Sequence, residues 1–287
     1  MIDFRSRVTA QKTVLAAGAY DALSALIIER SGFEAVVASG LGIAASAIGR
    51  PDAGLYTMTE NLDVVRNMAA TVKIPVIADI DTGYGNALNV MRTVREFERA
   101  GVSAIIIEDQ VAPKRCPVSV LGVEVISVEE AEGKIRAAVD ARQNPETVII
   151  ARTDVMDEAA AIERARRYVI AGADLIQPIS RTFRSIQGLQ ALRQGSGAPL
   201  SLQLFGWLEA DLSNDDIASV AGLATYPFVA LLSVASALQE NLSALAAARS
   251  TAALPAKRMA LEEFNALIGF PDILKMQEHY LPGGVSG

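Results

Sequence analysis

The chain has 287 residues, of which 51% are apolar, so it is long enough for one large α/β barrel or two modest domains. A formal net charge of −7 argues against nucleic acid or an anionic membrane surface as the partner. The single cysteine, Cys116, excludes an internal disulfide and a thiolate metal cluster. With no basic and apolar leader at residues 1–14, we expect a cytoplasmic protein.

Eight apolar runs follow one another along the chain, each ending near a polar or glycine-rich turn. They lie at residues 14–19, 34–40, 74–81, 103–109, 147–154, 173–179, 199–205 and 223–229. Helix-like stretches fill the gaps, as at Leu88, Met91, Val94 and Phe97. Strands that are apolar on both faces and alternate with helices indicate a parallel sheet, and eight such units favour a closed (β/α)8 TIM barrel. The alternative is a doubly wound nucleotide-binding fold, but residues 17–25 lack its G-x-G-x-x-G turn.

We expect the barrel to span residues 1–250 and a C-terminal helical extension with a tail to span residues 251–287. The uncharged stretch 217–239 is long enough to cross a bilayer. However, Gly222 and Pro227 interrupt it and divide it into a short strand and a helix, so we expect core and no membrane span. The helix at residues 230–248 is apolar on more than one face, and a subunit interface is the simplest surface to cover it.

The third run ends in two aspartates, Asp79 and Asp81. Side chains alternate along a strand, so both are expected on the same face as Ile77. Two carboxylates roughly 7 Å apart on one inward face repel each other and lose hydration unless a cation joins them. The alternative is a pair of solvated acids in a loop beyond a shorter strand.

Further charged residues lie where a barrel carries its active site, at the C-terminal strand ends. They are Asp52 after the second run, Glu108 and Asp109 at the end of the fourth, and Arg152 and Asp154 at the end of the fifth. Oxygen ligands without histidine or thiolate favour Mg²⁺, with Mn²⁺ as a substitute. Arg152 suits a substrate carboxylate, or else forms a salt bridge with Asp154 or Glu108.

Several segments of the chain resemble the isocitrate lyase/phosphoenolpyruvate mutase superfamily. They are "ADIDTGYGNALNVMRTVREFERAG", "IIIEDQVAPKRC", "GKIRAAVDAR", "IIARTD", "AYDALSA" and "YPFVA". The resemblance covers residues 3–250 and implies a barrel whose eighth helix is swapped between subunits of a homotetramer. It also implies that Mg²⁺ is held by Asp81, with Asp52, Asp79 and Glu108 around it. By the same resemblance, the backbone of Ser39, Gly40 and Leu41 binds substrate carboxylates together with Arg152.

Three departures from the lyase pattern stand out. Lyase members typically carry Lys-Lys/Arg-Cys-Gly-His after strand four, whereas residues 114–119 are "KRCPVS". Ile179 stands where lyases have a glutamate, and Gln203 where they have an asparagine. The apparatus for a tricarboxylate is therefore incomplete, and the "GYGNALNVMRTV" stretch is much like that of oxaloacetate-decarboxylating members.

We assign Cys116, Tyr20 and Lys114 as candidate catalytic residues. Lys114 and Arg115 would lower the pKa of the Cys116 thiol and favour a thiolate acid/base, whereas the alternative is inert packing. Tyr20 either forms a hydrogen bond with substrate or caps the first strand.

The sequence predicts a Mg²⁺-dependent lyase that breaks a carbon–carbon bond of a small 2-oxo or 2-hydroxy dicarboxylate through an enolate. Candidate substrates are oxaloacetate-like or methylisocitrate/dimethylmalate-like di- or tricarboxylates. One alternative is a phosphonopyruvate or phosphoenolpyruvate P–C bond mutase or hydrolase. The other is a metal-binding barrel that has lost catalysis.

Overall fold

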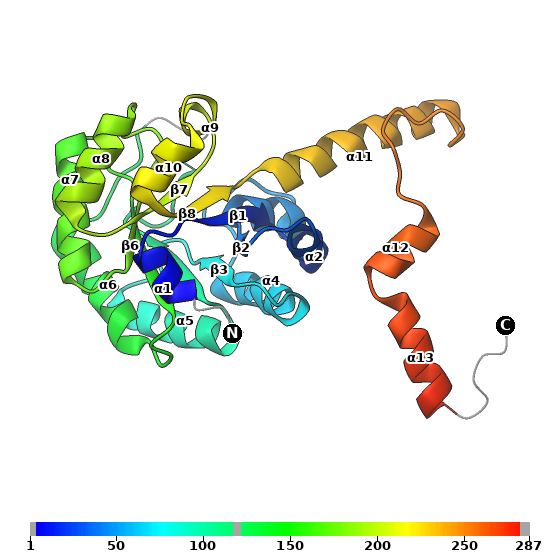
Figure 1. Cartoon of the computed structure of the whole chain (residues 1–287), viewed down its shortest axis with the longest axis horizontal. Helices are drawn as coiled ribbons and strands as arrows, with labels where there is room; N and C mark the ends of the chain where they lie inside the picture. Colours follow the sequence, from blue (N-terminus) through cyan, green and yellow to red (C-terminus); the bar gives the residue numbers. More distant parts are fainter. Residues whose placement is uncertain (1–3, 117–121, 282–287) are drawn as a thin grey trace. The chain divides into compact units, whose positions relative to one another are not determined.

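The computed structural model describes residues 4–116 and 122–281 (Figure 1). Eight parallel strands close into a barrel, each pairing with the next in sequence and β8 pairing with β1. The strands are β1 (Val14–Ala19), β2 (Ala35–Ala38), β3 (Val76–Asp79), β4 (Ala104–Glu108), β5 (Val148–Thr153), β6 (Leu175–Pro178), β7 (Leu200–Gln203) and β8 (Ala221–Tyr226). Each of the first seven predicted runs contains one strand, and the eighth overlaps β8, which begins two residues before that run, at Ala221. The predicted (β/α)8 barrel is confirmed.

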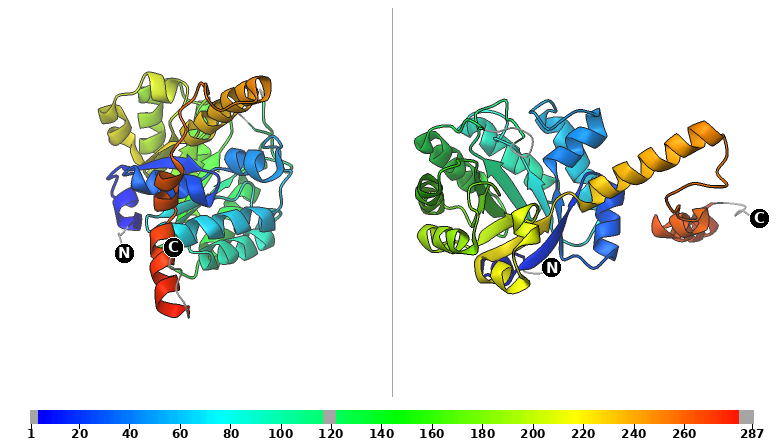
Figure 2. Two further views of the ribbon diagram at one scale, coloured as in Figure 1. Left: turned by 90° about the vertical axis from the view of Figure 1, so that its right-hand side faces the viewer. Right: turned by 90° about the horizontal axis from the view of Figure 1, so that it is seen from above.

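Helices connect successive strands and surround the barrel (Figures 1 and 2). They are α2 (Ala22–Arg30), α3 (Gly40–Ile43), the π-helical turn η1 (Ala44–Ile48), α4 (Met58–Thr71), α5 (Ala87–Arg99), α6 (Val128–Ala141), α7 (Glu158–Ile170), α8 (Ile186–Ser196), α9 (Trp207–Ala210) and α10 (Asn214–Val220). The helix predicted from the spacing of Leu88, Met91, Val94 and Phe97 is α5, and Val94 and Phe97 are buried in the core as expected. Leu88, expected on the same face, is 74% exposed in the first turn.

Two hydrophobic clusters hold the barrel together. One packs the outer faces of the strands against the helices, and the other fills the inside with strand residues such as Val37, Ile77 and Ile106. The short helix α1 (Phe4–Thr9) adds Phe4 and Val8 to the inner cluster. Gly222 permits this approach, because a Cβ atom there would lie 2.1 Å from the Val8 carbonyl oxygen.

The chain divides into two compact units, residues 1–231 and 232–287. The second unit contains most of α11 (Val229–Ala248), together with α12 (Leu261–Leu267) and α13 (Phe270–Tyr280). The domain boundary at residue 250 and the exchange of the eighth helix between subunits remain predictions.

The uncharged stretch 217–239 does split into a strand and a helix, but only the strand part is core. β8 is buried along most of its length, whereas α11 has no buried residue. Among the described residues, α11 is the one helix long and apolar enough to cross a membrane, which is weak evidence by itself.

Candidate active site

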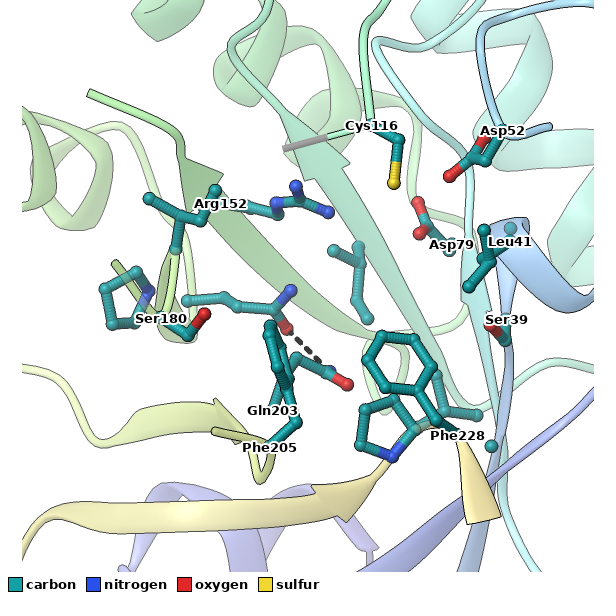
Figure 3. Close-up of a pocket in the computed structure, with 18 residues that line it drawn as sticks. Ser39, Leu41, Asp52, Asp79, Cys116, Arg152, Ser180, Gln203, Phe205 and Phe228 are labelled. Carbon is teal, nitrogen blue, oxygen red and sulfur yellow. Dashed lines mark hydrogen bonds between the residues drawn. The ribbon is translucent and has the colours of Figure 1, made fainter. Parts of the chain in front are cut away.

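A cavity of about 800 Å³, counting the space at its mouth, opens at the C-terminal ends of the strands (Figure 3). Seven of the predicted site residues line it. They are Ser39, Gly40, Leu41, Asp52, Asp79, Cys116 and Arg152. Asp79 and Arg152 lie at the C-terminal ends of β3 and β5, and the others lie in the segments that follow β2 and β4, so the closing of the barrel brings them together.

The segment after β2 brings the backbone close to the acids. Ser39 caps α3, and its hydroxyl accepts a hydrogen bond from Gly42 N at 3.3 Å. A Cβ atom on Gly40 would lie 2.9 Å from the Tyr56 hydroxyl and 3.4 Å from carboxylate oxygens of Asp79 and Asp81. Glycine is therefore required for this close approach.

Of the two aspartates, only Asp79 belongs to β3, so the prediction that Asp79 and Asp81 share a strand face is wrong. β3 ends at Asp79, and Asp81 has a left-handed backbone with φ of 51°. Asp81 N donates a hydrogen bond to Asp79 Oδ1 at 3.0 Å. The alternative of solvated loop acids also fails for Asp81, which is 5% exposed and accepts a hydrogen bond from the Tyr56 hydroxyl at 3.2 Å.

Lys114 supplies the cation that this acidic turn needs. Its Nζ lies 2.5 Å from Asp81 Oδ1 and 2.9 Å from the Asp52 carboxylate, and the side chain is 3% exposed. Burial acts to lower the pKa of Lys114, but the charges of Asp81, Glu108 and the other nearby acids raise it well above its usual value. Burial also raises the pKa of Asp81 to about 6, against the opposing effect of Lys114.

Arg152 forms both predicted salt bridges and still lines the cavity. Asp154 accepts hydrogen bonds from its Nε at 2.8 Å and its Nη2 at 2.9 Å. Arg152 Nη1 lies 3.0 Å from Glu108 Oε2, although neither Glu108 oxygen accepts a well-oriented hydrogen bond from the described residues. Burial raises the pKa of Glu108 well above its usual value, and Arg152 opposes that rise. Figure 3 shows the Arg152 guanidinium in the cavity, where an entering carboxylate would meet it.

We define the acidic cluster as Asp52, Asp79, Asp81 and Glu108. Among the described residues, Lys114 and Arg152 are the cations that pair with it, and Arg152 also pairs with Asp154. One Asp52 oxygen and both Glu108 oxygens accept no well-oriented hydrogen bond among the described residues, although Lys114 Nζ lies 2.9 Å from that Asp52 oxygen and Arg152 Nη1 lies 3.0 Å from Glu108 Oε2. These carboxylate oxygens could act as metal ligands, and a group of oxygen ligands fits a hard divalent cation. Within residues 4–116 and 122–281, however, no three acids group closely enough to hold an ion together, and the Lys114 ammonium lies between them.

The three candidate catalytic residues have different surroundings. Cys116 is half-buried, and Figure 3 shows its thiol facing into the cavity near Asp52, Asp79 and Arg152. Lys114 contacts the acidic cluster directly. Tyr20 is not among the residues that line the cavity, and its backbone N–H donates to Ser24 Oγ at 3.0 Å near the start of α2. Residues 117–119, where the chain departs from the lyase pattern, lie outside the described residues.

Away from the acids, the cavity is lined by apolar side chains together with the neutral polar side chains of Gln177, Ser180 and Gln203. Phe205 and Phe228 lie with ring centroids 5.1 Å apart, and Figure 3 shows both on the side opposite Cys116. Ile179, at the departure from the lyase pattern, is buried in this wall. Among the described residues that line the cavity, Arg152 is the only basic one. A second anionic group at this wall would therefore find no positive charge.

Sequence reasoning missed Tyr56, Gln110 and the aromatic pair Phe205 and Phe228. The aromatic residues each follow a strand end, so their position in the chain was a usable signal. Nothing local indicates Tyr56, which reaches Asp81 from a loop 25 residues earlier. Gln110 belongs to the "IIIEDQVAPKRC" segment, but that pattern does not reveal what its side chain contacts.

The family model described as phosphoenolpyruvate phosphomutase matches residues 4–254. The 2,3-dimethylmalate lyase of Eubacterium barkeri is 39% identical, over 97% of this chain and 97% of its own. The oxaloacetate decarboxylase of Chromohalobacter salexigens is 37% identical, over 71% of this chain and 70% of its own. A solved phosphonopyruvate hydrolase complex with oxalate and Mg²⁺ is 31% identical with a TM-score of 0.87, covering 98% of each chain.

Proposed function

Since the chain belongs to the phosphoenolpyruvate phosphomutase family, within the PEP mutase/isocitrate lyase superfamily, we propose that it is a Mg²⁺-dependent lyase of a small substituted dicarboxylate. The names of the relatives favour the predicted carbon–carbon lyase over P–C chemistry and over a barrel without catalysis. One observation carries the proposal. Arg152, Cys116 and two members of the acidic cluster, Asp52 and Asp79, line one cavity, and Lys114 and Arg152 link the other two members, Asp81 and Glu108, to it. Together these residues can bind an anion, hold a cation and supply a proton.

Different residues of the chain bind the substrate and the metal. Arg152 Nη1 and the backbone at residues 39–41 hold the carboxylate of the 2-oxo acid half. The acidic cluster would hold Mg²⁺, with Lys114 shifting away from Asp52 or Asp81 to make room. When bound, Mg²⁺ supplies positive charge beside the substrate oxygen on which negative charge develops.

For a 2-hydroxy dicarboxylate, we assign the proton steps as follows. The hydroxyl proton passes to a carboxylate of the acidic cluster, the C2–C3 bond breaks, and C2 becomes the carbonyl carbon of a 2-oxo acid. The bonding electron pair goes to C3, where Cys116 Sγ supplies a proton. Decarboxylation of oxaloacetate releases CO₂ and leaves the pair on a pyruvate enolate, so its first step needs no acid from the protein.

The apolar wall supports a substrate whose third substituent is an alkyl group. Ile179, Phe205 and Phe228 can bury methyl groups, whereas a third carboxylate would lose its hydration without gaining a positive partner. We therefore expect 2,3-dimethylmalate to be used better than 2-methylisocitrate, by about tenfold or more in kcat/KM.

The test is an assay of the purified chain with Mg²⁺ on 2,3-dimethylmalate, oxaloacetate, 2-methylisocitrate and phosphonopyruvate. We expect turnover of 2,3-dimethylmalate or oxaloacetate that EDTA abolishes and that Mg²⁺ or Mn²⁺ restores. Turnover of phosphonopyruvate alone would establish P–C chemistry instead. Mg²⁺ binding by calorimetry without turnover of any acid would favour the barrel without catalysis.

We also propose that the enzyme is a cytoplasmic homotetramer. The tetramer is supported by α11, a helix of 20 residues that has no buried side chain within the chain itself. The cytoplasmic location is supported by the soluble substrate class and by a single cysteine that forms no internal disulfide.

A further inference from the structure

Gln110 is a buried amide to which the proposed chemistry gives no role. It follows β4 after Asp109, and it is 1% exposed. An antiparallel bridge pairs Gln110 with Val125, and Val111 N donates to Glu124 O at 2.9 Å. The chain therefore leaves and rejoins the barrel at this point, and Gln110 lies at the fixed base of the segment that carries Cys116.

The Gln110 side chain joins two parts of the active site. Its Oε1 accepts a hydrogen bond from Arg115 N at 2.9 Å, and its Nε2 donates one to Asp154 Oδ2. A backbone N–H can only donate and a carboxylate can only accept, so the partners fix the orientation of the amide. A glutamate would lack the donor and a lysine would lack the acceptor, so a neutral amide suits both partners at once.

Asp154 links Gln110 to Arg152, because it accepts hydrogen bonds from both side chains. It accepts from Nε at 2.8 Å and Nη2 at 2.9 Å, and this paired contact fixes the plane of the guanidinium. Asp154 is itself held by Asp109, whose Oδ1 accepts from Asp154 N at 2.9 Å. The hydroxyl of Tyr168 donates to Asp109 Oδ2 at 2.7 Å. Gln110 is therefore anchored to a buried network of hydrogen-bonded side chains.

We propose that Gln110 is a positioning residue that sets the Arg115–Cys116 backbone, and with it the thiol, at a fixed place relative to the Arg152 guanidinium. Its importance for catalysis rests on the proposed function, in which Cys116 and Arg152 act on one substrate molecule. The carboxylate held by Arg152 and the carbon protonated by Cys116 are a few bonds apart. A small change in their relative position therefore slows the reaction more than it weakens binding.

The first test uses Cys116 as its own reporter, because it is the only cysteine of the chain. Gln110→Met keeps the length of the side chain and removes both hydrogen bonds. Loss of the hydrogen bond from Arg115 N frees the backbone next to Cys116, and one hydrogen bond of ordinary net strength shifts the equilibrium between held and released backbone by about tenfold. We therefore expect a chromogenic disulfide to label the thiol about tenfold faster in this variant. Gln190→Met, at an exposed position on α8, is the matched control and labels at the wild-type rate. Cys116→Ser abolishes labelling.

The second readout is the division between kcat and KM. In Gln110→Met we expect kcat to fall about tenfold while KM for the best substrate stays within about threefold, because Asp154 still holds Arg152. A purely structural role would lower the melting temperature and leave the kcat of the folded enzyme unchanged. The labelling rate needs no turnover, so it tests the positioning even if the proposed function fails.

Gln110→Glu distinguishes the hydrogen bond with Arg115 N from the one with Asp154, and it replaces Gln110→Met as the test variant if Gln110→Met does not fold. It keeps the acceptor for Arg115 N, so labelling of Cys116 should stay within about twofold of wild type. It places a second carboxylate beside Asp154, which pairs with Arg152, so the added negative charge opposes the binding of an anion at Arg152. We therefore expect oxalate binding with Mg²⁺, measured by calorimetry, to weaken about tenfold. The proposal is overturned if Gln110→Met leaves both labelling and kcat unchanged, or if Gln110→Glu leaves oxalate binding unchanged.

Discussion

Asp81 is the member of the acidic cluster that contacts Lys114, Tyr56 and the Asp79 carboxylate at the end of β3. Asp81→Asn keeps the shape and removes the charge that Mg²⁺ needs. We expect kcat/KM to fall by about 100-fold or more, and the Mg²⁺ concentration for half-maximal activity to rise.

The control for Asp81→Asn is Asp63→Asn, an exposed acid that pairs with Arg66 on α4. It should have wild-type activity and wild-type dependence on Mg²⁺. Activity of Asp81→Asn within a few-fold of wild type would contradict a role for the acidic cluster in metal binding.

Arg152 combines two hydrogen bonds to Asp154 with an ion pair between Nη1 and Glu108, and its side chain lines the cavity. Lysine has one ammonium and cannot reproduce this geometry. For Arg152→Lys we expect KM for the dicarboxylate to rise by about 100-fold and kcat to change less, in steady-state assays. Arg95→Lys, at an exposed position on α5, is the matched control. If KM is unchanged in Arg152→Lys, the substrate carboxylate binds elsewhere.

At the scale of single elements, α1 closes the inner core and is tied down by charge. Arg7 on α1 forms an ion pair with Glu34, and Leu15 N donates to the same carboxylate at 3.1 Å. Partial burial acts to raise the pKa of Glu34, but these hydrogen bonds bring it below its usual value. Glu34 therefore binds a proton less readily in the folded than in the unfolded chain.

A lowered pKa of an acid gives stability that is present above the unfolded value and is lost as pH falls through the folded value. We expect Glu34→Gln to lower the melting temperature by about 2 °C at pH 7, a small effect because the pair is partly exposed. The difference from wild type should shrink as pH falls below 4.5, the usual value of the group. Glu146→Gln, in an exposed loop, should show no difference at either pH. A pH-independent effect of Glu34→Gln would mean that packing, not charge, is responsible.

At the scale of the whole molecule, α11 indicates association with other copies of the chain. Leu238 and Leu242 are 54% and 58% exposed, and no residue of this long helix is buried. We expect light scattering with size-exclusion chromatography to give a mass near four times the 30.3 kDa of one chain. Leu238→Glu should lower this mass, whereas Leu88→Glu, at an exposed site on α5, should not. A wild-type monomer would exclude the proposed tetramer.

Much of the fold was available from local pattern, because strand and helix periodicity depends on neighbours in the chain. The run at residues 14–19 coincides with β1. The positions of Asp79, Glu108 and Arg152 at strand ends followed from barrel topology alone, since parallel strands bring those ends to one rim. Asp52 lies further away, in the long connection after β2. The pattern failed at Asp81, where a left-handed turn replaced the expected strand.

Contacts between distant loops were decided only by the tertiary structure. Lys114 meets Asp52 across 62 positions of the chain, and Gln110 meets Asp154 across 44. No spacing in the sequence encodes these pairs, because they exist only once the barrel has closed and excluded water from its rim. The sequence determined the barrel and the acids around its mouth. The structure decided that the Lys114 ammonium lies between those acids, because burying so many carboxylates together requires the nearest positive charge to join them.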